Sequence, residues 1–277
     1  MSRPSLLRRW LYCVLLASLA CGSTVLAHAV PPQPAQNSQP AQNADPNAHP
    51  LDPALKRAYE GLKHIKEDIK DYTCTLIKRE RIDGKLQEVE EIETKVRHEP
   101  FSVYMKFKKP DDAKGREVIF VHGANDGNLL AHERRGFNLG MVSLKPNSAL
   151  AMKGNRYAIT EVGIYNLTRR LVEVAENDRQ FGECDVSIVP SEINQRPCTL
   201  MQVVHPVPRK NLLFHITRIY VDDEMNVPVR YEAYEWPEKT GGPPVLTEVY
   251  AYVDLKLNPG LTDADFDPQN PNYSFKK

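Results

Sequence analysis

The sequence predicts an α+β fold in which a strongly curved antiparallel sheet, a half-open β-barrel, wraps around two or more helices. Two stretches carry an apolar stripe at helical spacing, and about nine or ten short stretches have the composition and alternation of strands. Most of these strands follow one another through short turns, which favours antiparallel pairing. A sheet of that size twists and curls. The absence of strand–helix–strand alternation disfavours a parallel, doubly wound sheet.

Each predicted helix has an apolar face that must pack against another part of the protein. The first is expected to start at Asp52, a good N-cap followed by Pro53. Its apolar residues are Leu51, Leu55, Ala58, Tyr59, Leu62, Ile65 and Ile69. The second is expected over 161–176, after Thr160 as cap. Its apolar residues are Ile164, Leu167, Leu171, Val174 and Ala175.

The expected strands cover most of the remaining chain. Asp83-Gly84, between the first two strands, is typical of a type I′ hairpin turn. Residues 136–157 follow neither period and are expected to be irregular or mixed. The strands are expected at 72–82, 85–97, 101–108, 116–122, 128–133, 184–189, 198–205, 212–221, 227–236 and 245–255.

The first 50 residues differ in composition from the rest. Residues 1–29 have a basic start, an apolar run too short to span a bilayer, and Ala27-His28-Ala29 as a cleavage site. They are predicted to be a signal peptide. Residues 30–50 are rich in Pro, Gln and Ala, which predicts a disordered linker. Residues 51–277 are then expected to form a single curved-sheet domain.

A second cleavage site competes with the first. Ser18-Leu19-Ala20-Cys21 resembles the lipobox of bacterial lipoproteins, although Ser18 stands where leucine is usual. We expect an exported protein of the periplasm. The alternative is a lipoprotein that is peripherally anchored in the membrane through a lipidated Cys21.

The charge balance gives no reason to expect a nucleic-acid partner. The chain has 36 basic and 36 acidic residues, and three of the arginines lie in residues 1–29, which contain no acid. The processed chain therefore keeps 33 basic against 36 acidic residues. Nucleic-acid binding usually needs a basic excess.

The cysteines allow one disulfide. Cys184 and Cys198 flank the turn-rich stretch 190–197 and could face each other across a hairpin, and export permits the bond. The alternative is that both, with Cys74, are buried thiols that pack as small apolar groups. Without a Cys-x-x-Cys pair, neither a zinc site nor a redox motif is expected.

Motifs with known chemistry are incomplete in this chain. His122-Gly123 is unaccompanied by Gly-x-Ser-x-Gly, and His132-Glu133 lacks the second histidine of a zinc helix. The acids of 263–267 lack the glycine and glutamate that an EF-hand requires. We expect no catalytic residues, no metal site and no cofactor.

Three stretches resemble a known family. They are Tyr72-Thr-Cys-Thr-Leu-Ile-Lys-Arg-Glu80, Val227-Pro-Val-Arg-Tyr-Glu-Ala-Tyr-Glu-Trp-Pro237 and the C-terminal run 248–275. Together they resemble DUF1571, exported bacterial proteins of unknown function that are common in planctomycetes. More distantly, the order of elements is similar to carriers of the LolA/LolB type. That resemblance implies a LolA/LolB-like half-barrel with a helical lid and an apolar cavity for acyl chains.

Apolar and aromatic side chains on the strands are the candidate ligand-binding residues. The set is Phe101, Met105, Phe107, Ile119, Val121, Phe214, Ile216, Trp236 and Tyr250. They fit a hypothesis in which a non-enzymatic periplasmic or envelope protein binds a hydrophobic ligand, either a lipid or the acyl chains of a lipoprotein. The alternative is a structural or protein-interaction module of the cell envelope with a fully packed core. A cavity of a few hundred Å³ would distinguish the two.

Overall fold

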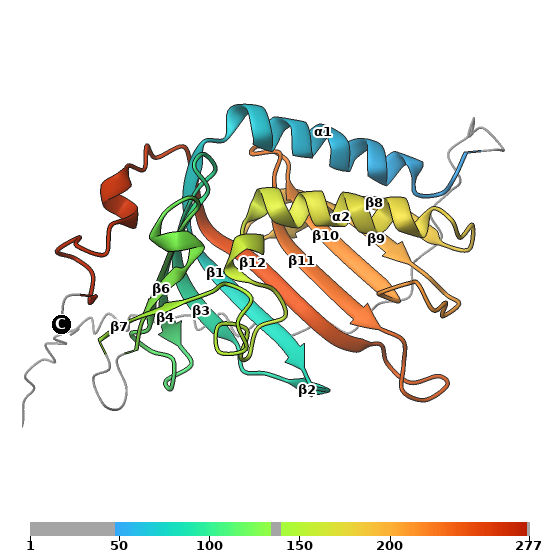
Figure 1. The fold of residues 1–277 in the computed structure, drawn as a ribbon. Helices are drawn as coiled ribbons and strands as arrows, with labels where there is room; N and C mark the ends of the chain where they lie inside the picture. Colours follow the sequence, from blue (N-terminus) through green and yellow to red (C-terminus); the bar gives the residue numbers. More distant parts are fainter. Residues whose placement is uncertain (1–47, 134–139, 276–277) are drawn as a thin grey trace, which may run out of the picture. The chain divides into compact units, whose positions relative to one another are not determined.

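The computed structural model describes residues 48–133 and 140–275. In this part of the chain, α1 (Asp52–Asp68) and α2 (Ile164–Asp178) lie across one face of a twelve-stranded antiparallel sheet (Figure 1). We call the face under the helices the inner face and the opposite one the outer face. The predicted signal peptide, Cys21 and most of the predicted linker lie outside the described residues.

The sheet consists of two meanders that meet at its centre. Its order is β7-β6-β5-β4-β3-β1-β12-β11-β10-β9-β8, and β2 pairs with β1 beside this path. The central pair joins β1 to β12, from Tyr72 opposite Leu257 to Glu80 opposite Glu248. Because β7 and β8 end the path, the described sheet is open. The strands are β1 Asp71–Ile82, β2 Lys85–Leu86, β3 Glu90–Arg97, β4 Ser102–Lys109, β5 Glu117–Val121, β6 Leu129–His132, β7 Met141–Leu144, β8 Asp185–Ile193, β9 Arg196–Val204, β10 Ile216–Asp222, β11 Pro228–Glu235 and β12 Val245–Leu257.

The predicted antiparallel meander with two helices is confirmed, with corrections at element ends. Asp83 and Gly84 both have positive φ, as a type I′ turn requires. The stretch 136–157, expected to be irregular or mixed, contains β7. Leu51 rather than Asp52 occupies the N-cap of α1. Thr160 does not cap α2, because residues 159–161 form a separate 3-10 turn and α2 starts after Gly163.

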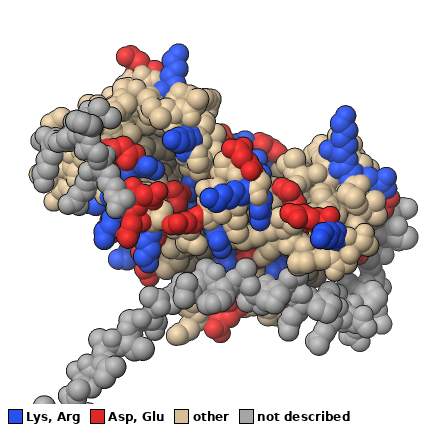
Figure 2. All heavy atoms as spheres, turned by 90° about the horizontal axis from the view of Figure 1, so that it is seen from below, with Lys and Arg blue, Asp and Glu red and all other residues tan. Residues whose placement is uncertain are grey.

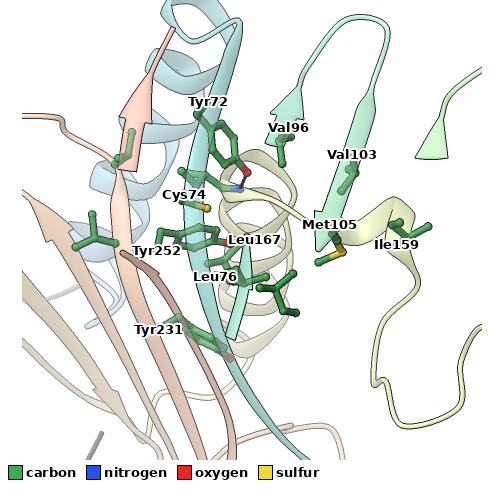
Figure 3. Close-up of a cluster of buried hydrophobic side chains, with 14 of the residues drawn as sticks. Tyr72, Cys74, Leu76, Val96, Val103, Met105, Ile159, Leu167, Tyr231 and Tyr252 are labelled. Carbon is green, nitrogen blue, oxygen red and sulfur yellow. Dashed lines mark hydrogen bonds between the residues drawn. The ribbon is translucent and has the colours of Figure 1, made fainter. Parts of the chain in front are cut away.

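The inner face carries the main hydrophobic core. Alternate residues of β1 point toward the helices, and Tyr72 and Leu76 lie in one cluster with Leu167 of α2 (Figure 3). Ile65 of α1 belongs to this cluster as well. Tyr231 of β11 belongs to the same cluster. Each large apolar side chain buried there contributes about 1.5–3 kcal/mol to folding. The core therefore fixes both helices on the sheet.

A second core lies on the outer face of β4 and β5. The C-terminal segment, residues 259–275, crosses this face and inserts Phe266, which is buried. Tyr273 stacks on Tyr104 with ring centroids 4.0 Å apart. Thr262 and Asp265 form the capping box of the 3-10 helix η3 (Asp263–Phe266). The acidic run 263–267 therefore serves as a turn that holds the C-terminal segment.

The predicted disulfide between Cys184 and Cys198 is wrong, because both cysteines are free. In the β8–β9 hairpin, Cys198 lies opposite Ser191, whereas Asp185 lies opposite Val204. The two cysteines are therefore near opposite ends of the hairpin, roughly 20 Å apart at about 3.3 Å per residue. A disulfide needs Cα atoms within about 7 Å.

Asp222 organises the turn between β10 and β11. Its carboxylate is buried and accepts hydrogen bonds from Arg196 Nε at 2.5 Å and Nη2 at 3.0 Å. It also accepts the backbone N–H groups of Glu224 and Met225, at 3.0 and 2.9 Å. The Arg196 hydrogen bonds hold the pKa of Asp222 below its ordinary value.

Gly163→Ala is expected to lower the free energy of unfolding by at least about 2 kcal/mol. Gly163 has φ 111° and ψ 162°, a region essentially restricted to glycine. A Cβ atom there would stand 2.7 Å from the Tyr72 hydroxyl oxygen, which accepts the Ile164 N–H. Urea unfolding measures the effect. Gly154→Ala is the control, since its φ is also positive but the space around it is open. Equal losses for the two variants would contradict the steric argument.

Asp222→Asn is expected to destabilise the protein by about 1–3 kcal/mol at pH 7, because the carboxylate bonds are charge-assisted. The folded pKa lies below the unfolded one, so this stabilisation is present above about pH 4 and is lost as the pH falls through the folded pKa. Unfolding curves at pH 7 and pH 3 check the prediction. Asp223→Asn, which changes an exposed carboxylate, is the control. A deficit of the same size at both pH values would refute the pKa assignment.

Candidate functional site

The candidate site is a cavity of about 240 Å³ between the two helices and the inner face of β9 and β10. The turn from β10 to β11 forms one side of it. Its lining residues are Arg57, Ala58, Glu60, Gly61, Thr168, Leu171, Thr199, Met201, Ile219, Val221, Asp222, Asp223, Asn226 and Pro228.

Small residues on α1 leave this space open. Leu55 and Ile65 are buried at the two ends of the helix, whereas Ala58 and Gly61 lie between them over the cavity. A Cβ atom on Gly61 would meet nothing within 4 Å. Glycine inside a helix costs about 1 kcal/mol relative to alanine. Glycine at position 61 therefore lowers the stability of α1 at the point where a larger side chain would enter the cavity.

The walls are apolar and the rim is polar. Leu171 faces Met201 and Ile219 across the cavity. Arg57 and Glu60 are exposed on α1, and Asp223, on the opposite side, accepts the Thr199 hydroxyl at 2.8 Å. This arrangement suits a molecule with an apolar body, and the rim carries both signs of charge.

Two polar contacts tie α1 down beside the cavity. His64 Nε2 lies 3.2 Å from the carbonyl oxygen of Met225 in the β10–β11 turn. The Tyr59 hydroxyl donates to Glu176 Oε1 of α2 at 2.8 Å in an exposed position. Exposed hydrogen bonds add little to stability because water competes for both partners. The middle of α1 is therefore held less firmly than its buried ends.

A smaller hollow of about 50 Å³ continues the cavity toward the start of α1. Ala58, Leu171, Met201 and Ile219 line both spaces. Phe214 also lines the smaller hollow, and most of the remaining lining is apolar. The two spaces are therefore neighbours beneath the helices, and we refer to them together as the passage.

The inner face of β1 and β12 carries a polar cluster. The Tyr157 hydroxyl donates to Glu248 Oε2 at 2.8 Å, and Arg156 Nε lies 2.9 Å from the same oxygen. The Tyr250 hydroxyl donates to Glu80 Oε1 at 2.5 Å, and the Arg156 N–H donates to Glu80 Oε2 at 2.9 Å. Burial raises the pKa of Glu248.

This polar cluster fixes the connecting segment, residues 145–162, which joins β7 to α2. Lys78 adds a hydrogen bond to Asn155 Oδ1 at 2.6 Å and an ion pair with Glu90 at 2.7 Å. Both carboxylates of the cluster are satisfied by protein groups. We therefore assign it to holding the connecting segment.

The structure separates the nine predicted ligand-binding residues. Phe214 alone among them lines the passage. Met105 and Phe107 are buried in the main core, and Phe101 packs against it. Ile119 and Val121 lie on the outer face under the C-terminal segment.

The remaining three have other roles. Ile216 lies opposite Tyr234 in the β10–β11 ladder. Because side chains alternate along a strand and the next residue, Thr217, lines the smaller hollow, Ile216 lies on the outer face. Trp236 donates from Nε1 to the carbonyl oxygen of His205 at 3.1 Å. Tyr250 belongs to the polar cluster and stacks on Tyr231. Sequence reasoning missed the lining residues of α1 and β9, and the signal that could have found them is Gly61 within a helical stripe.

We also searched the described residues for metal-ligand clusters, membrane-spanning helices and patches of a single charge. Residues 48–133 and 140–275 hold no group of three His, Cys, Asp or Glu side chains that could bind a metal ion. No helix in these ranges is long and apolar enough to cross a membrane. Figure 2 shows Lys and Arg interspersed with Asp and Glu over the described residues on one side of the molecule.

The solved structures that are similar to this chain include the following three. A putative outer membrane lipoprotein-sorting protein domain from Vibrio parahaemolyticus has 13% identity and a TM-score of 0.37, with 77% of this chain and 95% of that chain covered. The lipoprotein LppX from Mycobacterium tuberculosis has 13% identity and a TM-score of 0.43, covering 78% and 100%. An uncharacterised conserved protein from Thermus thermophilus has 10% identity and a TM-score of 0.43, covering 77% and 92%. At these sequence identities and TM-scores, the structural similarity does not support an argument about function.

No curated protein matches the chain at a significant level. A family model described as "Protein of unknown function (DUF1571)" matches residues 69–275. That range runs from the end of α1 through η3 and contains all twelve strands and α2. It includes the three stretches on which the sequence resemblance rests. The chain therefore belongs to the DUF1571 family.

Proposed function

We propose that this protein is a non-enzymatic, exported protein of the cell envelope that binds the apolar part of a hydrophobic ligand beneath α1 and α2. The ligand would be a lipid or the acyl chains of a lipoprotein. The sheet would act as a half-open β-barrel, and the helices as its lid. One observation carries the proposal: a cavity of about 240 Å³ with a mainly apolar surface remains unfilled on an otherwise packed inner face.

The size of the cavity fits part of an acyl chain. A methylene is similar in size to a water molecule, whose share of the liquid is about 30 Å³. The cavity therefore accepts about eight carbon atoms. At about 0.8 kcal/mol per buried methylene, their transfer from water contributes about 6 kcal/mol before the costs of association are subtracted. We therefore expect a single chain to bind no more tightly than a Kd of tens of micromolar, ~40 μM.

Entry needs only a local movement of α1. The buried anchors of this helix are Leu51 and Leu55 at one end and Ile65 and Ile69 at the other. Its middle is held by the exposed Tyr59–Glu176 hydrogen bond and the His64 contact described above. Segments with few buried contacts open at low free-energy cost. The middle of α1 is thus suited to act as the lid.

A structural or protein-interaction module is the competing function. The densely packed core around Met105 and Phe107 favours it, because half of the inner face has the filled interior that such a module needs. It predicts no saturable uptake of apolar probes. The periplasmic location rests on the export signal, and membrane attachment rests on the motif at Cys21.

Gly61→Phe is expected to weaken binding of a fluorescent fatty acid at least tenfold, because the ring would occupy the cavity. The measurement is a fluorescence titration of the purified, delipidated protein. Gly61→Ala is the matched control. It should gain about 0.5–1 kcal/mol of stability from helix propensity and bind within about twofold of the wild type. Wild-type protein without saturable uptake, or a Gly61→Phe variant that binds normally, would overturn the proposal.

A further inference from the structure

The two spaces of the passage differ in the polarity of their walls. Four exposed polar residues line the larger cavity but not the smaller hollow: Arg57 and Glu60 of α1, and Asp223 and Asn226 of the β10–β11 turn. Because these side chains are exposed, they mark the end of the passage that opens to water. A polar group of a ligand would keep its hydration at this end.

The smaller hollow has mostly apolar walls at the start of α1. Leu51, Leu55 and Phe214 are all buried and line the hollow but not the larger cavity. Its two ionisable residues, Asp178 and His205, are almost fully buried and contact each other, with Oδ2 and Nε2 3.2 Å apart. A headgroup placed here would lose its hydration, which costs free energy. The hollow therefore suits hydrocarbon.

The wall that the two spaces share is apolar. A ligand that reaches from one space into the other would therefore meet only apolar side chains on the way. The residues that line both spaces are Ala58, Leu171, Met201 and Ile219.

We propose that the passage binds a single-chain amphiphile in one fixed direction. The methyl end of the chain lies in the smaller hollow, and the headgroup lies at the mouth between α1 and the β10–β11 turn. This inference rests on the proposed function and names the class of its ligand: a molecule with one hydrocarbon chain and a terminal polar group, rather than a lipid with two chains.

The volumes limit the ligand to one chain. The hollow of about 50 Å³ adds room for about two carbon atoms to the eight that the larger cavity accepts. One chain of about ten to twelve carbons therefore fills the passage. A second chain would have to displace buried side chains such as Leu55 and Phe214. A packed interior resists that insertion.

Trp236 provides an internal probe of the direction. Its indole N–H donates to the backbone carbonyl oxygen of His205, whose side chain lines the smaller hollow. A bromine atom quenches indole fluorescence only at short range. The only other tryptophan, Trp10, lies in the predicted signal peptide, so a Trp10→Phe variant leaves Trp236 as the sole indole.

Two brominated isomers test the direction in this variant. 12-Bromo-1-dodecanol carries bromine at the end of the chain, and 2-bromo-1-dodecanol carries it beside the uncharged headgroup. At saturation, we expect the first to remove most of the Trp236 emission and the second to leave most of it. Displacement of a fluorescent fatty acid shows when each isomer is bound. Equal or reversed quenching would overturn the direction, whereas failure of both isomers to bind would overturn the proposed function itself.

Two further isomers test the single-chain class on the wild type. In 6-dodecanol the hydroxyl divides the hydrocarbon of 1-dodecanol into two short chains, and only one of them can enter while the hydroxyl stays at the mouth. Because the other chain keeps its contact with water, we expect 1-dodecanol to bind at least about tenfold more tightly in the same displacement assay. Equal affinities would show that the passage accepts two chains and would overturn the class.

Ala54→Leu locates the methyl end. Ala54 lines the smaller hollow but not the larger cavity, so the added side chain takes the space that the end of a long chain needs. We expect the wild type to bind 1-dodecanol at least about tenfold more tightly than 1-octanol, and Ala54→Leu to bind the two within about twofold.

Lys56→Leu is the matched control, because Lys56 is exposed on the same helix and lines neither space. It should keep the wild-type dependence on chain length. If Ala54→Leu also keeps that dependence, the chain does not end in the hollow and the proposal is wrong.

Discussion

Pairing between β1 and β12 is the interaction on which the rest of the structure depends. These strands lie about 170 residues apart along the chain, and closing a loop of that length costs about 4–5 kcal/mol. Their ladder joins the meander β1–β7 to the meander β8–β12 and removes an unpaired edge from each. It also gives both helices one continuous surface. Without this pairing, the apolar faces of α1 and α2 would have no common sheet to pack against. The cavity beneath them would then lose the strands that line it.

The two halves of the inner face then differ in how they are filled. Under β3 and β4, large side chains such as Phe107 reach the core, and the connecting segment 145–162 is fixed there by Glu80 and Glu248. Under α1, the small residues Ala58 and Gly61 leave the surface of β9 and β10 uncovered. Helix propensity and packing would both favour a larger residue at position 61. The open passage is therefore consistent with a function that outweighs the local cost.

Local features of the fold could be predicted from the sequence, whereas features that depend on register could not. The helix stripes and the Asp83-Gly84 turn are set by neighbouring residues, so their patterns are visible directly. Ile119 and Val121 were misplaced because β5 is apolar on both faces, and a period of two then gives no preference for either face. The pairing of Cys184 with Cys198 failed because only the hairpin register shows that they are far apart. Gly61 was visible as a weakness in the helix, but whether a neighbour fills the gap depends on tertiary packing.

Buried polar groups have different roles in the two halves of the molecule. Glu80 and Glu248 meet Tyr250, Tyr157 and Arg156, so their desolvation is offset by protein partners and the connecting segment stays in place. On the other side of the molecule, His205 Nε2 lies 3.2 Å from Asp178 Oδ2. A satisfied network makes an interior rigid. The satisfied cluster therefore keeps one half of the inner face closed, whereas the small residues of α1 leave the other half open.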